Sequence, residues 1–73
     1  MPTDTNQSAR NWSRNAVAEL TRAINEIVDG VSFLPEDSDM FLARINAARV
    51  SAAKADEALM RAKVMLEDST DAD

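Results

Sequence analysis

Residues 41–66 of this chain, FLARINAARVSAAKADEALMRAKVML, decide its fold. Within this stretch apolar residues recur in alternating steps of four and three, and neither glycine nor proline interrupts it. The repeating positions are Phe41, Ile45, Ala48, Ala52, Ala55, Leu59, Ala62 and Leu66. A heptad repeat predicts an α-helix that packs lengthwise against another helix. The alanines among these positions predict that the partner helix comes close.

A second periodic stretch lies upstream and has the same spacing. Its apolar residues are Val17, Leu20, Ile24, Ile27 and Val31. We expect a helix over about residues 8–29, because Thr5 or Ser8 is a suitable N-cap and Gly30 is typical of a left-handed C-cap. The charge-rich stretch before residue 41 contains Pro35, so a turn is expected over residues 30–36.

The second helix is expected over about residues 37–68, with Asp37 or Ser38 as its N-cap. Residues 69–73 are expected to form a disordered acidic tail. Two helices joined by a short connection form an antiparallel hairpin. The sequence therefore predicts an all-α fold: one domain over residues 1–73, an antiparallel two-helix hairpin with an Ala-rich heptad seam.

Counting outward from the turn places Ile24 near Ile45 and Leu20 near Ala48, so that large residues of the first helix face small ones of the second. The second helix is expected to extend past the start of the first helix. The apolar residues in this overhanging part of the second helix would then be uncovered. Assembly into a dimer or a higher helical bundle is therefore expected. The predicted oligomer interface comprises Trp12, Leu59, Met60, Val64, Met65 and Leu66.

The composition argues against several classes of function. The 73 residues contain no cysteine and no histidine, which argues against a nucleophilic triad and a Cys/His metal site. We therefore expect no enzyme activity, no catalytic residues, no cofactor and no metal. The net charge of −5 disfavours direct binding to DNA or RNA. No apolar run reaches membrane-spanning length, and the polar N-terminus lacks a secretory signal, so we expect a cytoplasmic protein with no membrane partner.

Two groups of residues are candidates for binding. The first lies around the turn and is either a cap on the hairpin core or a binding site for a protein partner. It comprises Phe33, Leu34, Met40, Phe41 and Arg44. The second is a polar stripe on the second helix, which is either a solvated face or, in an oligomer, a groove for an anionic ligand such as a nucleotide. It comprises Ser51, Lys54 and Arg61.

Pro35 and two short runs also carry a family resemblance. The runs Asp39-Met40-Phe41-Leu42-Ala43 and Ala58-Leu59-Met60-Arg61-Ala62 resemble the second helix of phage-encoded helical-hairpin counter-defence proteins, oligomers that sequester cyclic nucleotide signals. Related small phage hairpins bind and block host regulators. The resemblance implies a small non-enzymatic interaction protein of phage type that binds and inhibits a host protein in the host cytoplasm.

Two alternatives stay open beside this interpretation. The same resemblance implies, as one alternative, an oligomeric sponge that sequesters a cyclic or other anionic nucleotide. Length and layout are also similar to the helical-hairpin co-chaperones of type III secretion. That similarity implies, as the other alternative, a co-chaperone or assembly factor.

Overall fold

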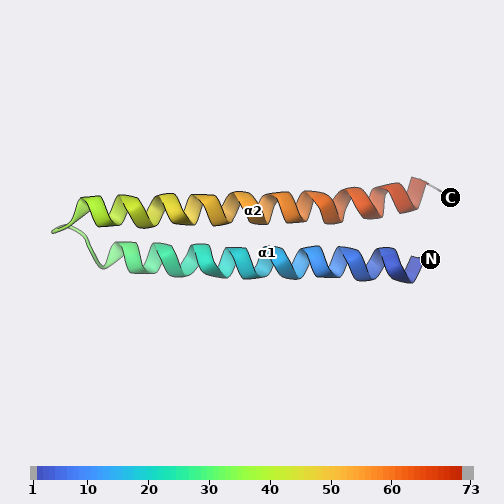
Figure 1. The fold of residues 1–73 in the computed structure, drawn as a ribbon, viewed down its shortest axis with the longest axis horizontal. Helices are drawn as coiled ribbons and strands as arrows, with labels where there is room; N and C mark the ends of the chain where they lie inside the picture. Colours follow the sequence, from blue (N-terminus) through green and yellow to red (C-terminus); the bar gives the residue numbers. More distant parts are fainter. Residues whose placement is uncertain (1, 72–73) are drawn as a thin grey trace.

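The protein is described here by a computed structural model, which covers the backbone of residues 2–71 and the side chains of residues 5–68. Two long helices make up this part of the chain, α1 (Pro2–Val31) and α2 (Ser38–Asp71). They run side by side in opposite directions and form a rod whose longest dimension is 58 Å (Figure 1). The predicted all-α antiparallel hairpin is confirmed.

The contact surface between the two helices is built from small residues. On α1, buried residues recur at every seventh position: Ala9, Ala16, Ala23 and Gly30. On α2, they recur in steps of three and four: Ala48, Ser51, Ala55, Ala58 and Ala62. We call these residues the small-residue seam. Since none of them has a side chain longer than a hydroxymethyl group, the two backbones approach closely, and no large side chain is fully buried in the described part of the chain.

Gly30 shows how close this approach is. A Cβ atom at this position would lie 3.1 Å from the Cβ of Arg44 and 3.5 Å from the ring of Phe41. The predicted role of Gly30 as a left-handed cap is wrong, because Gly30 lies inside α1 and does not have a positive φ. The glycine is needed instead because α2 occupies the space that a side chain would fill.

The turn that joins the helices is held by backbone hydrogen bonds between residues three positions apart. The amides of Ser32 and Phe33 donate to the carbonyl oxygens of Asp29 and Gly30 at 3.2 and 3.0 Å, which tightens the end of α1. The start of α2 is fixed by Asp37, whose Oδ1 accepts a hydrogen bond from the amide of Met40 at 3.1 Å. Of the two predicted N-caps of the second helix, the structure selects Asp37.

Both helices are longer than predicted. α1 begins at Pro2 rather than near residue 8, since proline is compatible with a first helical turn and no helix-breaking residue follows it before Gly30. α2 continues to Asp71, so residues 69–71 of the predicted disordered tail are helical, and residues 72–73 lie outside the described residues. The helices have 30 and 34 residues. α2 is still the longer helix, but Leu66 lies in one groove with Ala9 and Arg10 of α1, so the predicted overhang of the apolar residues of α2 is wrong.

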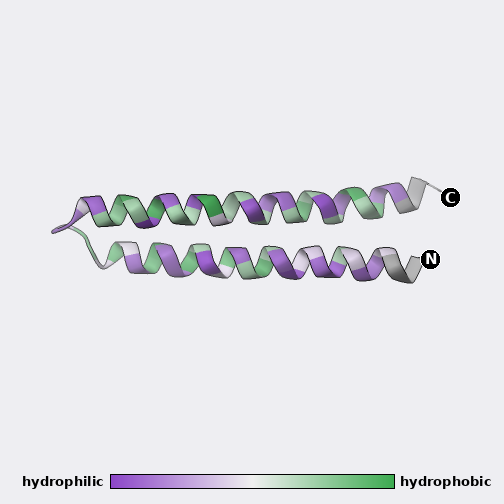
Figure 2. Cartoon of the chain, viewed as in Figure 1, coloured by the Kyte–Doolittle hydropathy of each residue, from purple (hydrophilic) through white to green (hydrophobic). Residues whose placement is uncertain are grey.

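Apart from Trp12, which packs against the cluster of Ala16, Ala55 and Ala58, the large apolar residues of α1 lie outside the seam, contrary to the prediction. Leu20 and Ile24 are 42% and 59% exposed. On α2 the predicted seam is correct in part: Ala48, Ala55 and Ala62 are buried, whereas Ala52 and Leu59 are exposed. Hydrophobic residues in Figure 2 accordingly occur on sides of both helices that do not face the partner helix. Counting large residues chose the wrong stripe on α1, because a ladder of small residues lets the two backbones pack more closely than large side chains would.

Candidate interaction surfaces

Six large apolar residues of α1 form a continuous exposed stripe near the turn. Their exposed fractions run from 42% to 63%. They are Val17, Leu20, Ile24, Ile27, Val28 and Val31, and we call them the outer stripe. Val17 and Ile24 each come one residue after a seam alanine, and Leu20 and Ile27 each come four residues after one. The stripe therefore lies beside the seam, about 40° to 100° around the helix. This position leaves it outside the contact with α2.

The charged residues of the same segment lie on a different side of α1. Arg22 pairs with Glu19 at 3.1 Å, and Glu26 pairs with Arg44 of α2 at 3.3 Å. Thr21, which lies next to the outer stripe, donates its hydroxyl hydrogen to the carbonyl oxygen of Val17 at 2.8 Å. The outer stripe therefore contains no charge and little unsatisfied polarity.

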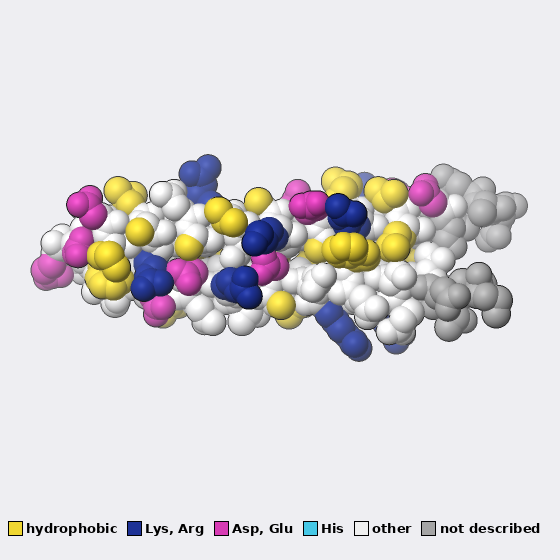
Figure 3. Space-filling view, in the orientation of Figure 1, with side chains coloured by type: hydrophobic (Ala, Val, Ile, Leu, Met, Phe, Trp, Pro, Cys, Tyr) yellow, Lys and Arg dark blue, Asp and Glu magenta, His cyan; other side chains and the backbone are white. Residues whose placement is uncertain are grey.

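A polar groove runs between the helices on the other face of the hairpin. Its lining includes Trp12, Glu19, Arg22, Lys54, Glu57 and Arg61. Lys, Arg, Asp and Glu side chains alternate along this face, with a hydrophobic group toward the end that carries the termini (Figure 3). The Arg61 guanidinium lies 5.0 Å from the centroid of the Trp12 ring and pairs with Glu57 at 2.9 Å. Since acids and bases both line the groove, its charge is mixed.

The predicted anionic-ligand stripe is only partly present on this surface. Lys54 and Arg61 both line the polar groove. Ser51 does not, because it is 5% exposed and belongs to the small-residue seam. Placing Ser51 with the other two was wrong, since a position three residues before Lys54 is turned about 60° around the helix.

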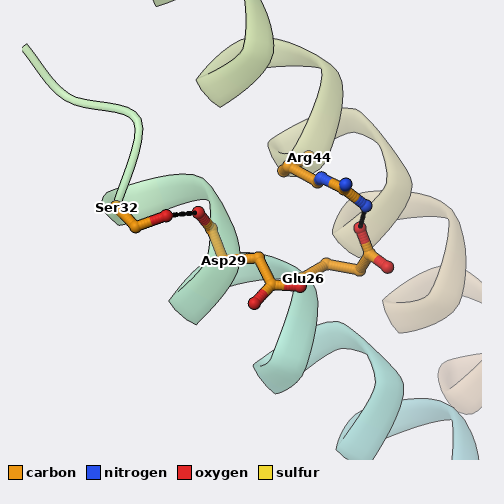
Figure 4. A network of polar contacts seen from close by, with 4 residues as sticks. All are labelled: Glu26, Asp29, Ser32 and Arg44. Atoms are coloured by element: carbon orange, nitrogen blue, oxygen red, sulfur yellow. Dashed lines mark hydrogen bonds and ion pairs between the residues drawn. The ribbon is translucent and has the colours of Figure 1, made fainter. Parts of the chain in front are cut away.

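The predicted partner-binding residues at the turn have mixed roles. Phe33, Phe41 and Arg44 are half-buried, and Arg44 reaches across the hairpin to Glu26 (Figure 4). Near this bridge the Ser32 hydroxyl donates to the carbonyl oxygen of Asp29 at 2.6 Å (Figure 4). Leu34 and Met40 are 42% and 37% exposed. Part of this group therefore closes the end of the hairpin, and the binding role of the exposed part stays a prediction.

The structure separates the six residues of the predicted oligomer interface. Trp12, Met60, Val64 and Met65 lie together around a groove beside Arg61. Leu66 lines a different groove, together with Ala9 and Arg10. Leu59 is 46% exposed. The six residues therefore lie on more than one side of the hairpin, because successive residues such as Met65 and Leu66 point about 100° apart on a helix. Their role in an oligomer interface stays a prediction.

Two features of the hairpin were missed in the sequence. One is the bridge from Glu26 to Arg44, which connects residues 18 positions apart and has no local sequence signal. The other is the seam of α1, which did have a signal, since its three alanines and Gly30 are spaced by seven. The outer stripe was recognised as apolar and periodic, but it was assigned to the wrong interface.

Comparison with known protein families, curated proteins and solved structures finds no match to this chain. Within the described residues, neither helix has the long apolar stretch that crossing a membrane requires. The same part of the chain brings no three His, Cys, Asp or Glu side chains together as metal ligands. The surfaces themselves are therefore the basis for a functional proposal.

Proposed function

We propose that this chain is a non-enzymatic protein-interaction module that binds a helix of a partner chain through the outer stripe of α1. The observation that carries the proposal is the exposure of six neighbouring Val, Leu and Ile side chains at 42% to 63%. Contiguous apolar surface of this kind is typical of protein interfaces. Isolated exposed apolar residues would carry no such meaning.

The energy available from covering the outer stripe is substantial. Complete burial of one Val, Leu or Ile side chain contributes about 1.5–3 kcal/mol. The six residues are about half exposed, so covering them contributes roughly 5–9 kcal/mol before the entropy cost of association. This contribution is large compared with what a lone core of this size supplies, about 3–5 kcal/mol.

The spacing of the outer stripe supports a helix as the partner. Val17, Leu20, Ile24, Ile27 and Val31 follow steps of three and four, the pattern by which one helix packs lengthwise on another. The straight run of α1 across this segment presents the stripe without a break. A helical partner would therefore meet every member of it.

The kind of partner, the origin of the chain and its location in the cell stay predictions. Inhibition of a host protein, a phage origin and a cytoplasmic location rest on the sequence and on the resemblance. The polar groove gives less support to a nucleotide sponge than the outer stripe gives to protein binding. The reason is that Arg22 and Arg61 already pair with Glu19 and Glu57. The absence of cysteine and histidine from the sequence supports a role without catalysis.

A photo-crosslinking amino acid placed at Ile24 tests the proposal. The full chain with the photo-crosslinking amino acid at position 24 would be expressed in the organism that carries its gene. The same amino acid in place of Asn25 is the matched control. Asn25 is the next residue, is exposed and is not part of the outer stripe. We expect one discrete protein adduct from position 24 and far less from position 25. Equal adducts at both positions, or none from position 24, would contradict the proposal.

A further inference from the structure

We infer that the outer stripe is covered by a second copy of this chain, with the two α1 helices packed antiparallel about a twofold axis near Ile24. The result is a four-helix dimer. This inference rests on the proposed function, because it names the partner of the same surface.

The composition of the hairpin core is the first argument for a second copy. The seam contains alanine, glycine and serine, and no large side chain is fully buried among the described residues. A chain of this length needs more buried apolar surface, or staples, to remain folded. The sequence offers no cysteine for a disulfide. A partner required for folding must be present wherever the chain is made, and the chain itself meets that condition.

The order of side chains along the outer stripe is the second argument. An antiparallel pair centred on Ile24 places Val17 opposite the partner's Val31 and Leu20 opposite the partner's Val28. Side chains of similar size thus meet across the axis, and the interface is self-complementary, as twofold symmetry requires.

The distribution of charge is the third argument. A twofold interface brings each residue near its axis close to its own copy, so a charge there would be repelled. The outer stripe has no charged member, and the neighbouring Glu19, Arg22 and Glu26 form ion pairs on another side of α1. Self-association through the stripe therefore meets no like-charge penalty at its centre.

Native mass spectrometry and light scattering on the purified full chain test the stoichiometry. We expect twice the single-chain mass of 8.0 kDa at micromolar concentration. Ile24→Glu is expected to shift the protein to a monomer, because it buries a charge beside its own copy. The matched control Asn25→Glu is expected to stay a dimer. A wild-type monomer, or a dimer that Ile24→Glu leaves intact, would overturn the inference.

Disulfide crosslinking tests the antiparallel arrangement without relying on a destabilising variant. The natural chain contains no cysteine, so a single introduced thiol reports on its own neighbours. Ile24→Cys is expected to oxidise to a covalent dimer. A mixture of Val17→Cys and Val31→Cys is expected to form the mixed dimer about tenfold more than either variant links to itself, because bridging requires close Cα atoms. Preferential self-linking of Val17→Cys would show a parallel pair and overturn the arrangement.

The interaction module and its assignment to a second copy of the chain can be refuted separately. A monomer in isolation, combined with an adduct from position 24 to a different protein in cells, would overturn the second copy and leave the interaction module standing. No adduct from position 24 to any protein, together with a monomer in isolation, would overturn both.

Discussion

Replacing Ala55 with leucine tests the small-residue seam most directly. Ala55 is 1% exposed and packs in a cluster with Ala16 and Ala58, which are also buried. A leucine adds three carbon atoms at a place where the neighbours have no side-chain rotamers with which to move aside. The helices must separate, or the leucine must adopt a strained rotamer.

The expected cost follows from this geometry. Overpacking a well-packed core costs about 1–3 kcal/mol, and we expect the upper end, about 3 kcal/mol, because backbone rather than flexible side chain opposes the new atoms. For a domain of this size each kcal/mol shifts the melting temperature by roughly 4–8 °C, so a decrease of about 12–24 °C is expected. Far-UV circular dichroism during heating measures it, at one protein concentration for all variants.

Two matched controls separate the observed seam from the seam that the sequence predicted. Ala52→Leu and Ala53→Leu make the same chemical change at exposed positions on α2. Each is expected to change the free energy of unfolding by no more than about 0.5 kcal/mol. If Ala52→Leu melts as far below Ala53→Leu as Ala55→Leu does, the predicted seam, which includes both Ala52 and Ala55, is restored. If Ala55→Leu melts with Ala53→Leu, the observed burial of Ala55 is refuted.

Three further predictions concern the turn end of the hairpin. Gly30→Leu is expected to lower the melting temperature, since a Cβ there already meets the Cβ of Arg44 at 3.1 Å. Asn25→Leu, at an exposed position outside the outer stripe, is expected to change it little. Asp37→Ala is expected to lower the free energy of unfolding in urea by about 1 kcal/mol, because the N-cap of α2 is lost. Glu36→Ala in the turn is expected to lower it by much less, and equal effects of the two variants would contradict the cap. A double-mutant cycle of Glu26→Gln and Arg44→Ala is expected to give a coupling of at most about 1 kcal/mol, because both side chains are partly exposed; no coupling would mean that the bridge contributes nothing in solution.

The fold class follows from local patterns in the sequence. The uninterrupted heptad pattern of residues 41–66 required a long helix, and a second periodic stretch across a proline-containing connection required a hairpin. Asp37 was correctly one of two predicted caps, because capping depends on a local hydrogen bond to an amide three residues away. Local patterns sufficed here because each depends only on residues that are near in sequence.

The stripe that is buried within the hairpin depends instead on how the two helices pack. Both α1 stripes have helical spacing, so the sequence favoured the larger residues, Leu20 and Ile24, as the more hydrophobic choice. The structure buries Ala16, Ala23 and Gly30 instead, since close contact between two backbones depends on shape along the whole interface and not on the hydrophobicity of single residues. That choice also left the outer stripe uncovered, and it is the physical reason why α1 presents a candidate binding surface.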